Sequence, residues 1–133
     1  MTPAIPLRKP KLYFDTVVRP THVTFDDGND LCRNLPWSHY LEARRRYGEP
    51  DILKIDIGGW LVVMRGHNLG PLFLAIEEHM LVRVRAQPEL GQDREREMDT
   101  FVTELRFTKP PPGGFGGKRG GQGEFDLGDN FPK

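Results

Sequence analysis

The densest group of residues able to bind an anion is a run of three arginines, Arg44, Arg45 and Arg46. Guanidinium groups form paired hydrogen bonds with phosphate oxygens, so this run could bind a nucleotide or a nucleic-acid backbone. On a helix, neighbouring side chains point in different directions, so the three would fan out and would not form one fork. The alternative interpretation is a solvated surface whose charge is balanced by Glu42 and Glu49.

The second candidate for anion binding is the turn Arg65–Asn68, which lies between an expected strand and an expected helix. The free N–H groups of a helix N-terminus favour an anion, and Arg65 and His67 would add further donors. The sequence therefore predicts a phosphate site at Arg65, His67 and Asn68. In the alternative interpretation Asn68 only caps the helix, because Asn is a preferred N-cap residue.

Other basic residues fall on the expected strands, and large aromatic residues fall on the expected helix at 36–47 and at the start of the strand at 60–65. Arg33, Arg83 and Arg85 add positive charge to the strands, and a basic sheet face could bind a phosphate backbone. Exposed aromatic rings on such a face could stack on bases, as they do in proteins that bind single strands. We expect the large aromatic residues to be core or interface anchors instead. They are Trp37, Tyr40 and Trp60.

The remaining reactive residues form no recognisable catalytic or metal-binding pattern. The histidines are scattered, at His22, His39, His67 and His79. Cys32 is the only cysteine, which excludes an internal disulfide and a zinc site with several cysteines. We therefore expect no catalytic residue, no metal and no cofactor. An enzyme that uses His39 or His67 as a general base is the weakest alternative, because spacing places no second catalytic group.

The C-terminal residues 109–133 differ in composition from the rest of the chain, being rich in Pro and then in Gly. Such a segment has little apolar area to offset the entropy of ordering, so we expect a flexible tail. Its last part carries Phe125, Leu127 and Phe131 among acidic residues. This pattern is typical of a short motif that docks into a groove of another protein, although a purely solubilising end is the alternative.

Composition limits the other possibilities. Lys and Arg together number 19, as do Asp and Glu, so the formal net charge is zero. A neutral chain has no protein-wide attraction to nucleic acid or to anionic membranes. No apolar run approaches the ~20 residues that cross a bilayer, and the Pro-rich start does not resemble a signal peptide. We expect a soluble, cytoplasmic protein.

The local patterns predict an α+β fold with one domain at residues 11–108, an extended arm at 1–10 and the tail at 109–133. Strands are expected at 11–19, 22–25, 31–35, 51–57, 60–65 and 80–86, and helices at 36–47 and 70–79. Residues 87–98 read as a charged loop, and residues 99–108 fit a helix or a strand, with β-branched content favouring a strand. The expected architecture is an antiparallel curved sheet or partial barrel of five to six strands with two short helices.

The sequence thus leads to a function of binding rather than of catalysis. The first hypothesis is a non-catalytic accessory module in a protein assembly, which contacts a protein partner or its own copies and uses the tail as a docking segment. The alternative is a nucleotide or nucleic-acid binding protein that uses the Arg65–Asn68 turn and the arginines at 44–46. We expect no contact with a membrane.

Overall fold

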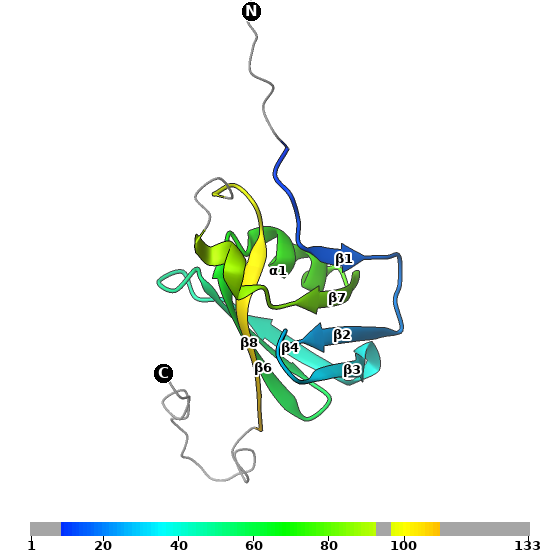
Figure 1. The fold of residues 1–133 in the computed structure, drawn as a ribbon. Coiled ribbons are helices and arrows are strands. Elements are labelled where there is room, and N and C mark those ends of the chain that lie inside the picture. The colour runs from blue at the N-terminus through cyan, green and yellow to red at the C-terminus, as the bar shows by residue number, and fades with distance from the viewer. Residues whose placement is uncertain (1–8, 93–96, 110–133) are drawn as a thin grey trace, which may run out of the picture.

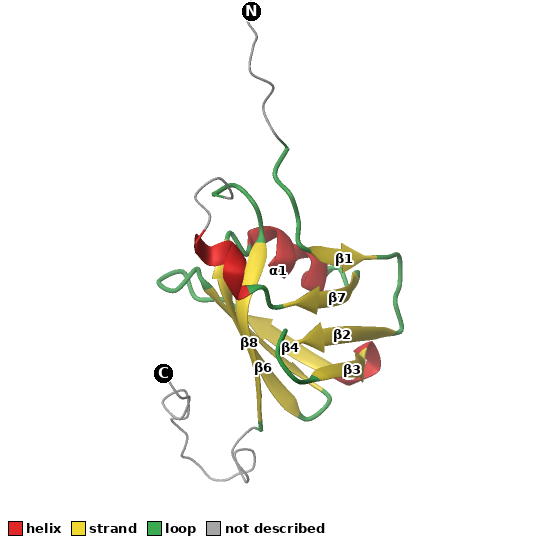
Figure 2. Cartoon of the chain, in the orientation of Figure 1, coloured by secondary structure: helices red, strands yellow, loops and turns green. Residues whose placement is uncertain are grey.

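The computed structural model describes residues 9–92 and 97–109. In chain order its elements are β1 (Phe14–Thr16), β2 (His22–Asp26), β3 (Cys32–Pro36), the 3₁₀ turn Trp37–His39, β4 (Tyr40–Arg44), β5 (Ile52–Ile57), β6 (Trp60–His67), α1 (Gly70–Glu77), β7 (Leu81–Arg85), the 3₁₀ turn Pro88–Gln92 and β8 (Phe101–Thr108). The described residues therefore form a small strand-rich α+β domain with a single α-helix (Figures 1 and 2).

The strands form two four-stranded sheets. Sheet I has the order β1-β7-β2-β3, in which β7 and β2 are parallel and the other pairs antiparallel. Sheet II has the order β4-β5-β6-β8 and is antiparallel throughout. Two isolated bridges, Leu12 to Thr100 and Ala86 to Val102, connect the sheets near the start of β8. The sequence predicted a curved sheet or partial barrel of five to six strands, whereas the described residues form eight strands in two sheets and no closed barrel.

Both hairpins expected from turn residues are confirmed. In the first, the Asp27 carboxylate accepts hydrogen bonds from the N–H groups of Asn29 at 2.8 Å, Asp30 at 2.9 Å and Leu31 at 3.2 Å, which shapes the turn between β2 and β3. In the second, Gly58 and Gly59 have φ values of 63° and 80° between β5 and β6. Two consecutive positive φ values match the type I′ turn that fits the twist of a hairpin.

The helix expected at residues 36–47 was wrong. The chain forms only a 3₁₀ turn at Trp37–His39 and then continues as β4. The Trp37 side chain is 7% exposed, and its indole N–H donates to the Leu81 carbonyl oxygen at 3.0 Å. Ala43 pairs with Ile55 of β5. Long-range pairing and burial therefore override the local helical spacing, which also leaves α1 as the one α-helix of the described residues.

The other segments agree more closely with expectation. The helix expected at 70–79 is α1, and its inward face carries Leu72, Ala75 and Ile76. The segment 80–86 contains β7, and the ambiguous segment 99–108 contains β8, so the strand interpretation is confirmed. The strand expected at 11–19 is confined to β1, and the loop expected at 87–98 includes the 3₁₀ turn Pro88–Gln92.

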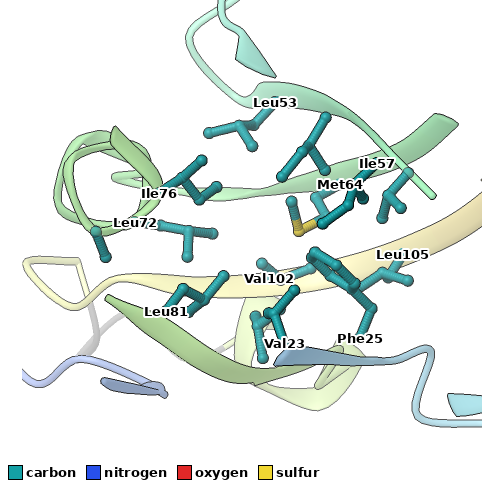
Figure 3. Close-up of a cluster of buried hydrophobic side chains, with 14 of the residues drawn as sticks. Val23, Phe25, Leu53, Ile57, Met64, Leu72, Ile76, Leu81, Val102 and Leu105 are labelled. Carbon is teal, nitrogen blue, oxygen red and sulfur yellow. The ribbon is translucent and has the colours of Figure 1, made fainter. Parts of the chain in front are cut away.

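The hydrophobic core lies between the two sheets and α1, which contacts β4 and β7. Figure 3 shows side chains of both sheets and of α1 pointing toward one another. The largest side chains with less than 2% exposure are Val23, Phe25, Leu53, Ile55, Ile57, Val62, Met64, Leu69, Leu72, Ile76, Leu81 and Val84. In β5, for example, Lys54 and Asp56 lie on the face turned away from the core and alternate with the buried Leu53, Ile55 and Ile57.

Candidate functional site

The predicted phosphate turn Arg65–Asn68 lies at the end of β6 and holds the segment before β8. The His67 ring stacks on Phe101 with centroids 5.5 Å apart, and its Nε2 lies 2.5 Å from the Glu97 carbonyl oxygen. The Asn68 amide nitrogen donates to the Met98 carbonyl oxygen at 3.2 Å. The side chains of His67 and Asn68 thus fix a neighbouring backbone segment.

Asn68 does not cap the helix. The N-cap of α1 is Leu69, without a side-chain hydrogen bond, and Asn68 has a left-handed φ of 54°. Its carbonyl oxygen accepts a hydrogen bond from the buried Thr100 hydroxyl at 2.7 Å. The capping interpretation was therefore wrong, and the residue instead links the start of α1 to the segment at 98–100.

The predicted arginine cluster is partly engaged by acidic side chains. Arg44 lies at the end of β4 and pairs with Glu42 at 2.6 Å and Asp56 at 2.7 Å. Partial burial acts to lower the pKa of the Arg44 guanidinium, but these two hydrogen bonds outweigh it and the pKa is raised. Arg45 donates to the Pro50 carbonyl oxygen at 3.4 Å, and Arg46 is exposed.

The two predicted groups share one surface only in part. Arg44 pairs in register with Lys54 and Arg65 pairs with Ile52, so both arginines lie on the outward face of sheet II, separated by β5. Arg65 Nε lies 3.7 Å from Glu104 Oε1. Phosphate binding by these residues stays a prediction, with Arg44 and Arg65 facing carboxylates. The predicted docking residues Phe125, Leu127 and Phe131 lie outside the described residues.

A different set of basic residues surrounds a hollow on sheet I. Phe14 of β1 pairs with Val84 of β7, and both pack on the core. Because side chains alternate along a strand, the residues flanking this pair lie on the outward face. They border a depression of about 310 Å³, here named the β1–β7 cleft. The cleft is lined by Lys11, Leu12, Tyr13, Phe14, Asp15, Arg83, Arg85 and Gln87.

The charges of the cleft are predominantly positive. Lys11, Arg83 and Arg85 line it together with one carboxylate, Asp15. Arg83 makes a long ion pair with Asp26, at 3.7 Å, and within the described part of the chain no ion pair joins Arg85 to a carboxylate. Two guanidinium groups with little acidic neutralisation are suited to bind a carboxylate or a phosphate in forked hydrogen bonds.

The cleft also has an apolar wall. Tyr13 is half-buried, and its ring meets Phe101 edge-on with centroids 6.1 Å apart. The Lys11 ammonium lies 4.7 Å from the centroid of the Tyr13 ring, and Leu12 is 48% exposed. A ligand of mixed character, with an anionic group beside an apolar or aromatic one, matches this lining.

The segment 11–13 is held in place by two fully buried polar residues. Asp99 Oδ1 accepts a hydrogen bond from the Lys11 N–H at 2.9 Å. Thr100 accepts at its carbonyl oxygen from the Tyr13 N–H and donates its own N–H to the Lys11 carbonyl oxygen, both at 2.9 Å. These bonds position Lys11 and Tyr13 against β7 and so form one side of the cleft.

Only the half of this site that lies on β7 could be predicted from the sequence. The alternation of Arg83 and Arg85 with buried valines marks them as outward-facing residues of a strand. The other half, Lys11 and Tyr13, comes from a segment about 70 residues earlier in the chain. Its position depends on the hydrogen bonds to Asp99 and Thr100 and on the pairing of β1 with β7, which no local pattern specifies.

Two further findings concern metal binding and membrane crossing. Across residues 9–92 and 97–109 no three His, Cys, Asp or Glu side chains cluster closely enough to hold a metal ion. In the same ranges no helix has the length and apolar character needed to cross a membrane. Comparison with protein-family models, with curated proteins and with solved structures finds no match for this chain.

Proposed function

We propose that this protein is a non-catalytic binding module of a protein assembly, and that the β1–β7 cleft holds an acidic segment of its partner. The single observation that carries the proposal is the convergence of Lys11, Arg83 and Arg85 on one depression with an exposed apolar wall. A guanidinium pair recognises a carboxylate by geometry as well as by charge, and the Tyr13 ring offers contact area to an adjacent apolar side chain.

A protein partner fits the cleft better than a nucleic acid does. A nucleic-acid binder usually shows a large excess of positive charge over an extended surface, whereas this chain has a formal net charge of zero. The observation that favours the nucleic-acid alternative is the presence of both Tyr13 and Arg85 in the lining of the cleft, since an aromatic ring can stack on a base while a guanidinium binds a phosphate. The same experiment can separate the two functions.

The experiment is a titration of the ¹⁵N-labelled full chain with an acidic peptide of alternating Glu and Phe, and separately with a short oligothymidylate. The peptide is expected to shift the backbone signals of residues 11–15 and 83–87. The double variant Arg83→Gln/Arg85→Gln should lose this response. The matched control Arg45→Gln/Arg46→Gln removes the same charge from another surface and should keep it.

Three results would count against the proposal. Binding of the oligothymidylate but not of the peptide, with loss in the Arg83→Gln/Arg85→Gln variant, would favour the nucleic-acid function. Peptide binding that is unchanged in Arg83→Gln/Arg85→Gln would place the site elsewhere. A cleft that responds to neither probe would contradict both functions.

A further inference from the structure

We propose that an acidic segment of this same chain, Glu124 to Phe131, occupies the β1–β7 cleft as an internal ligand. This inference rests on the proposed function, because it requires that the cleft bind an acidic, partly apolar segment. The docking residues Phe125, Leu127 and Phe131 would then bind in the β1–β7 cleft. The segment would compete there with any external partner.

The segment matches the cleft in its chemistry and in the spacing of its charges. The sequence at 124–127 is Glu-Phe-Asp-Leu, with acidic and apolar residues in alternation. In an extended segment the side chains of Glu124 and Asp126 would lie on one side, about 6.8 Å apart. Arg83 and Arg85 are likewise two residues apart on β7, so their Cα atoms have nearly the same spacing. Each carboxylate can therefore face one guanidinium.

The apolar members of the segment have a surface to contact as well. With the carboxylates directed to β7, Phe125 and Leu127 would project to the other side of an extended segment. The rim of the cleft offers the exposed Leu12 side chain and the half-buried ring of Tyr13. Contact between apolar groups would add to the charge interaction and would persist at high ionic strength.

The chain between β8 and Glu124 is long enough to bring the segment back to the cleft. β8 begins at Phe101, whose ring touches Tyr13 at the cleft, and runs away from β1 to Thr108 (Figure 1). Seven steps along a strand place Thr108 about 23 Å from that point. Fourteen residues lie between Lys109 and Glu124, and a Gly-rich linker of this length has a root-mean-square span of about 21 Å. A linker that matches the required span gives the highest effective concentration, so binding within one copy is favoured.

The outward face of sheet II is a weaker candidate for the same segment. It also carries arginines, but Arg44 pairs with Glu42 and Asp56, and Arg106 pairs with Glu104 at 2.8 Å. An incoming carboxylate would have to displace these partners. In the cleft, the only ion pair of the two β7 arginines with a described carboxylate is the 3.7 Å pair between Arg83 and Asp26, so the cleft is favoured.

The native cysteine allows a direct test on the full chain. Cys32 is exposed and pairs with Asp26, which pairs with Arg85, so it lies on the outward face of sheet I about 10 Å from Arg85. A nitroxide attached to Cys32 should broaden the NMR signals of residues 124–131 more than those of residues 113–117. The variant Arg83→Gln/Arg85→Gln should lose this difference, and the control Arg45→Gln/Arg46→Gln should retain it.

A competition measurement supplies the second readout. In the full chain, the triple variant Phe125→Ser/Leu127→Ser/Phe131→Ser should bind an added peptide of sequence 122–133 about tenfold more tightly than the original chain does, because the internal ligand no longer competes. Equal affinities of the two chains would overturn the inference, as would the absence of broadening at residues 124–131.

Two further controls define what each failure means. In a further sample, ¹⁵N-labelled chains are mixed with separate nitroxide-labelled chains. Broadening in this mixture would show binding between copies and would overturn the proposal that the segment binds within its own chain. If residues 124–131 show no broadening but the Glu/Phe peptide still shifts residues 83–87, the inference fails while the proposed function stands. If the peptide also fails to shift them, both fail.

Discussion

The guanidinium carbon of Arg33 lies 3.7 Å from the centroid of the Trp60 ring, so that a charged group of sheet I stacks on an aromatic side chain of sheet II. Arg33 pairs in register with the buried Phe25, which directs it toward the space between the sheets. Phe107 lies on the same side, with its ring centroid 5.1 Å from the guanidinium carbon. An inward-facing charge on an edge strand such as β3 also discourages pairing with another chain.

This contact predicts a measurable coupling between Arg33 and Trp60. Arg33→Met keeps the packing of the side-chain stem but removes the charge, and Trp60→Leu removes the ring. A double-mutant cycle of urea unfolding should give a coupling of about 1 kcal/mol, because the cation–π attraction exists only when both residues are present. Arg106→Met is the matched control, since Arg106 pairs with Glu104 on the outward face of sheet II.

The change in unfolding free energy for Arg33→Met alone combines two opposing effects, so its sign does not isolate the contact with Trp60. The double-mutant cycle isolates it. Arg33 Nε is buried and has no hydrogen-bond partner among the described residues. Its replacement relieves the cost of that unsatisfied group, about 1–3 kcal/mol, while it removes the attraction to Trp60. If the effects of the Arg33 and Trp60 substitutions on the unfolding free energy were additive, the cation–π interpretation would be contradicted.

The parts of the fold that were predictable from the sequence depend on local chemistry. The turns at Asp27 and at Gly58-Gly59 specify their hairpins through residues that lie within the turns themselves. The helix α1 follows from the spacing of its apolar residues and from Pro71 in its first turn. In each case the residues that decide the structure are neighbours in the sequence, so the pattern can be recognised without the fold.

The parts that were missed depend on partners far away in the chain. The segment after Pro36 has helical spacing, yet Trp37 packs against His79 and donates to Leu81. The division into two sheets and the cleft between β1 and β7 follow from similarly distant pairings. Likewise, the roles of His67 and Asn68 depend on the backbone at 97–98.

Gly66 is predicted to tolerate no side chain. It lies at an irregularity in the pairing of β6 with β8, where a Cβ would come within 2.8 Å of Val102 Cα and overlap the Phe101 carbonyl oxygen. Both obstacles are backbone atoms of a paired strand and cannot rotate away. Gly66→Ala should lower the free energy of unfolding by about 3 kcal/mol, the upper end of the range for overpacking.

The matched control for this variant is Gly48→Ala. A Cβ at Gly48 would meet no heavy atom within 4 Å. Its effect on urea unfolding should therefore stay within about 0.5 kcal/mol. Equal stabilities of the two alanine variants would show that the backbone of β8 moves easily at this point.

Replacement of Asn68 by glycine is predicted to destabilise the protein less than replacement by serine. Both substitutions remove the hydrogen bond to the Met98 carbonyl oxygen, but only glycine adopts the φ of 54° without strain. The strain of about 1–2 kcal/mol in serine exceeds the entropic disadvantage of glycine, about 0.5–1 kcal/mol, so Asn68→Gly should be the more stable variant by about 0.5 kcal/mol. A helix N-cap would give the opposite order, because serine caps as well as asparagine does.

Asp27 is predicted to make the stability of the protein depend on pH in the acid range. Its backbone hydrogen bonds, first from Asn29 and then from Leu31 and Asp30, hold the pKa of its carboxyl group below the ordinary value of 3.8. A folded-state pKa that is lowered contributes stability above the unfolded-state pKa, and this contribution is lost as the pH falls through the folded-state pKa.

The difference in unfolding free energy between the original chain and Asp27→Ala should therefore be constant near neutral pH and shrink below about pH 4. Asp27→Asn keeps an oxygen acceptor that does not titrate, so its difference from Asp27→Ala should not change with pH. Urea unfolding of the three chains across this range tests the assignment, and a difference between the original chain and Asp27→Ala that persists unchanged into strong acid would contradict it.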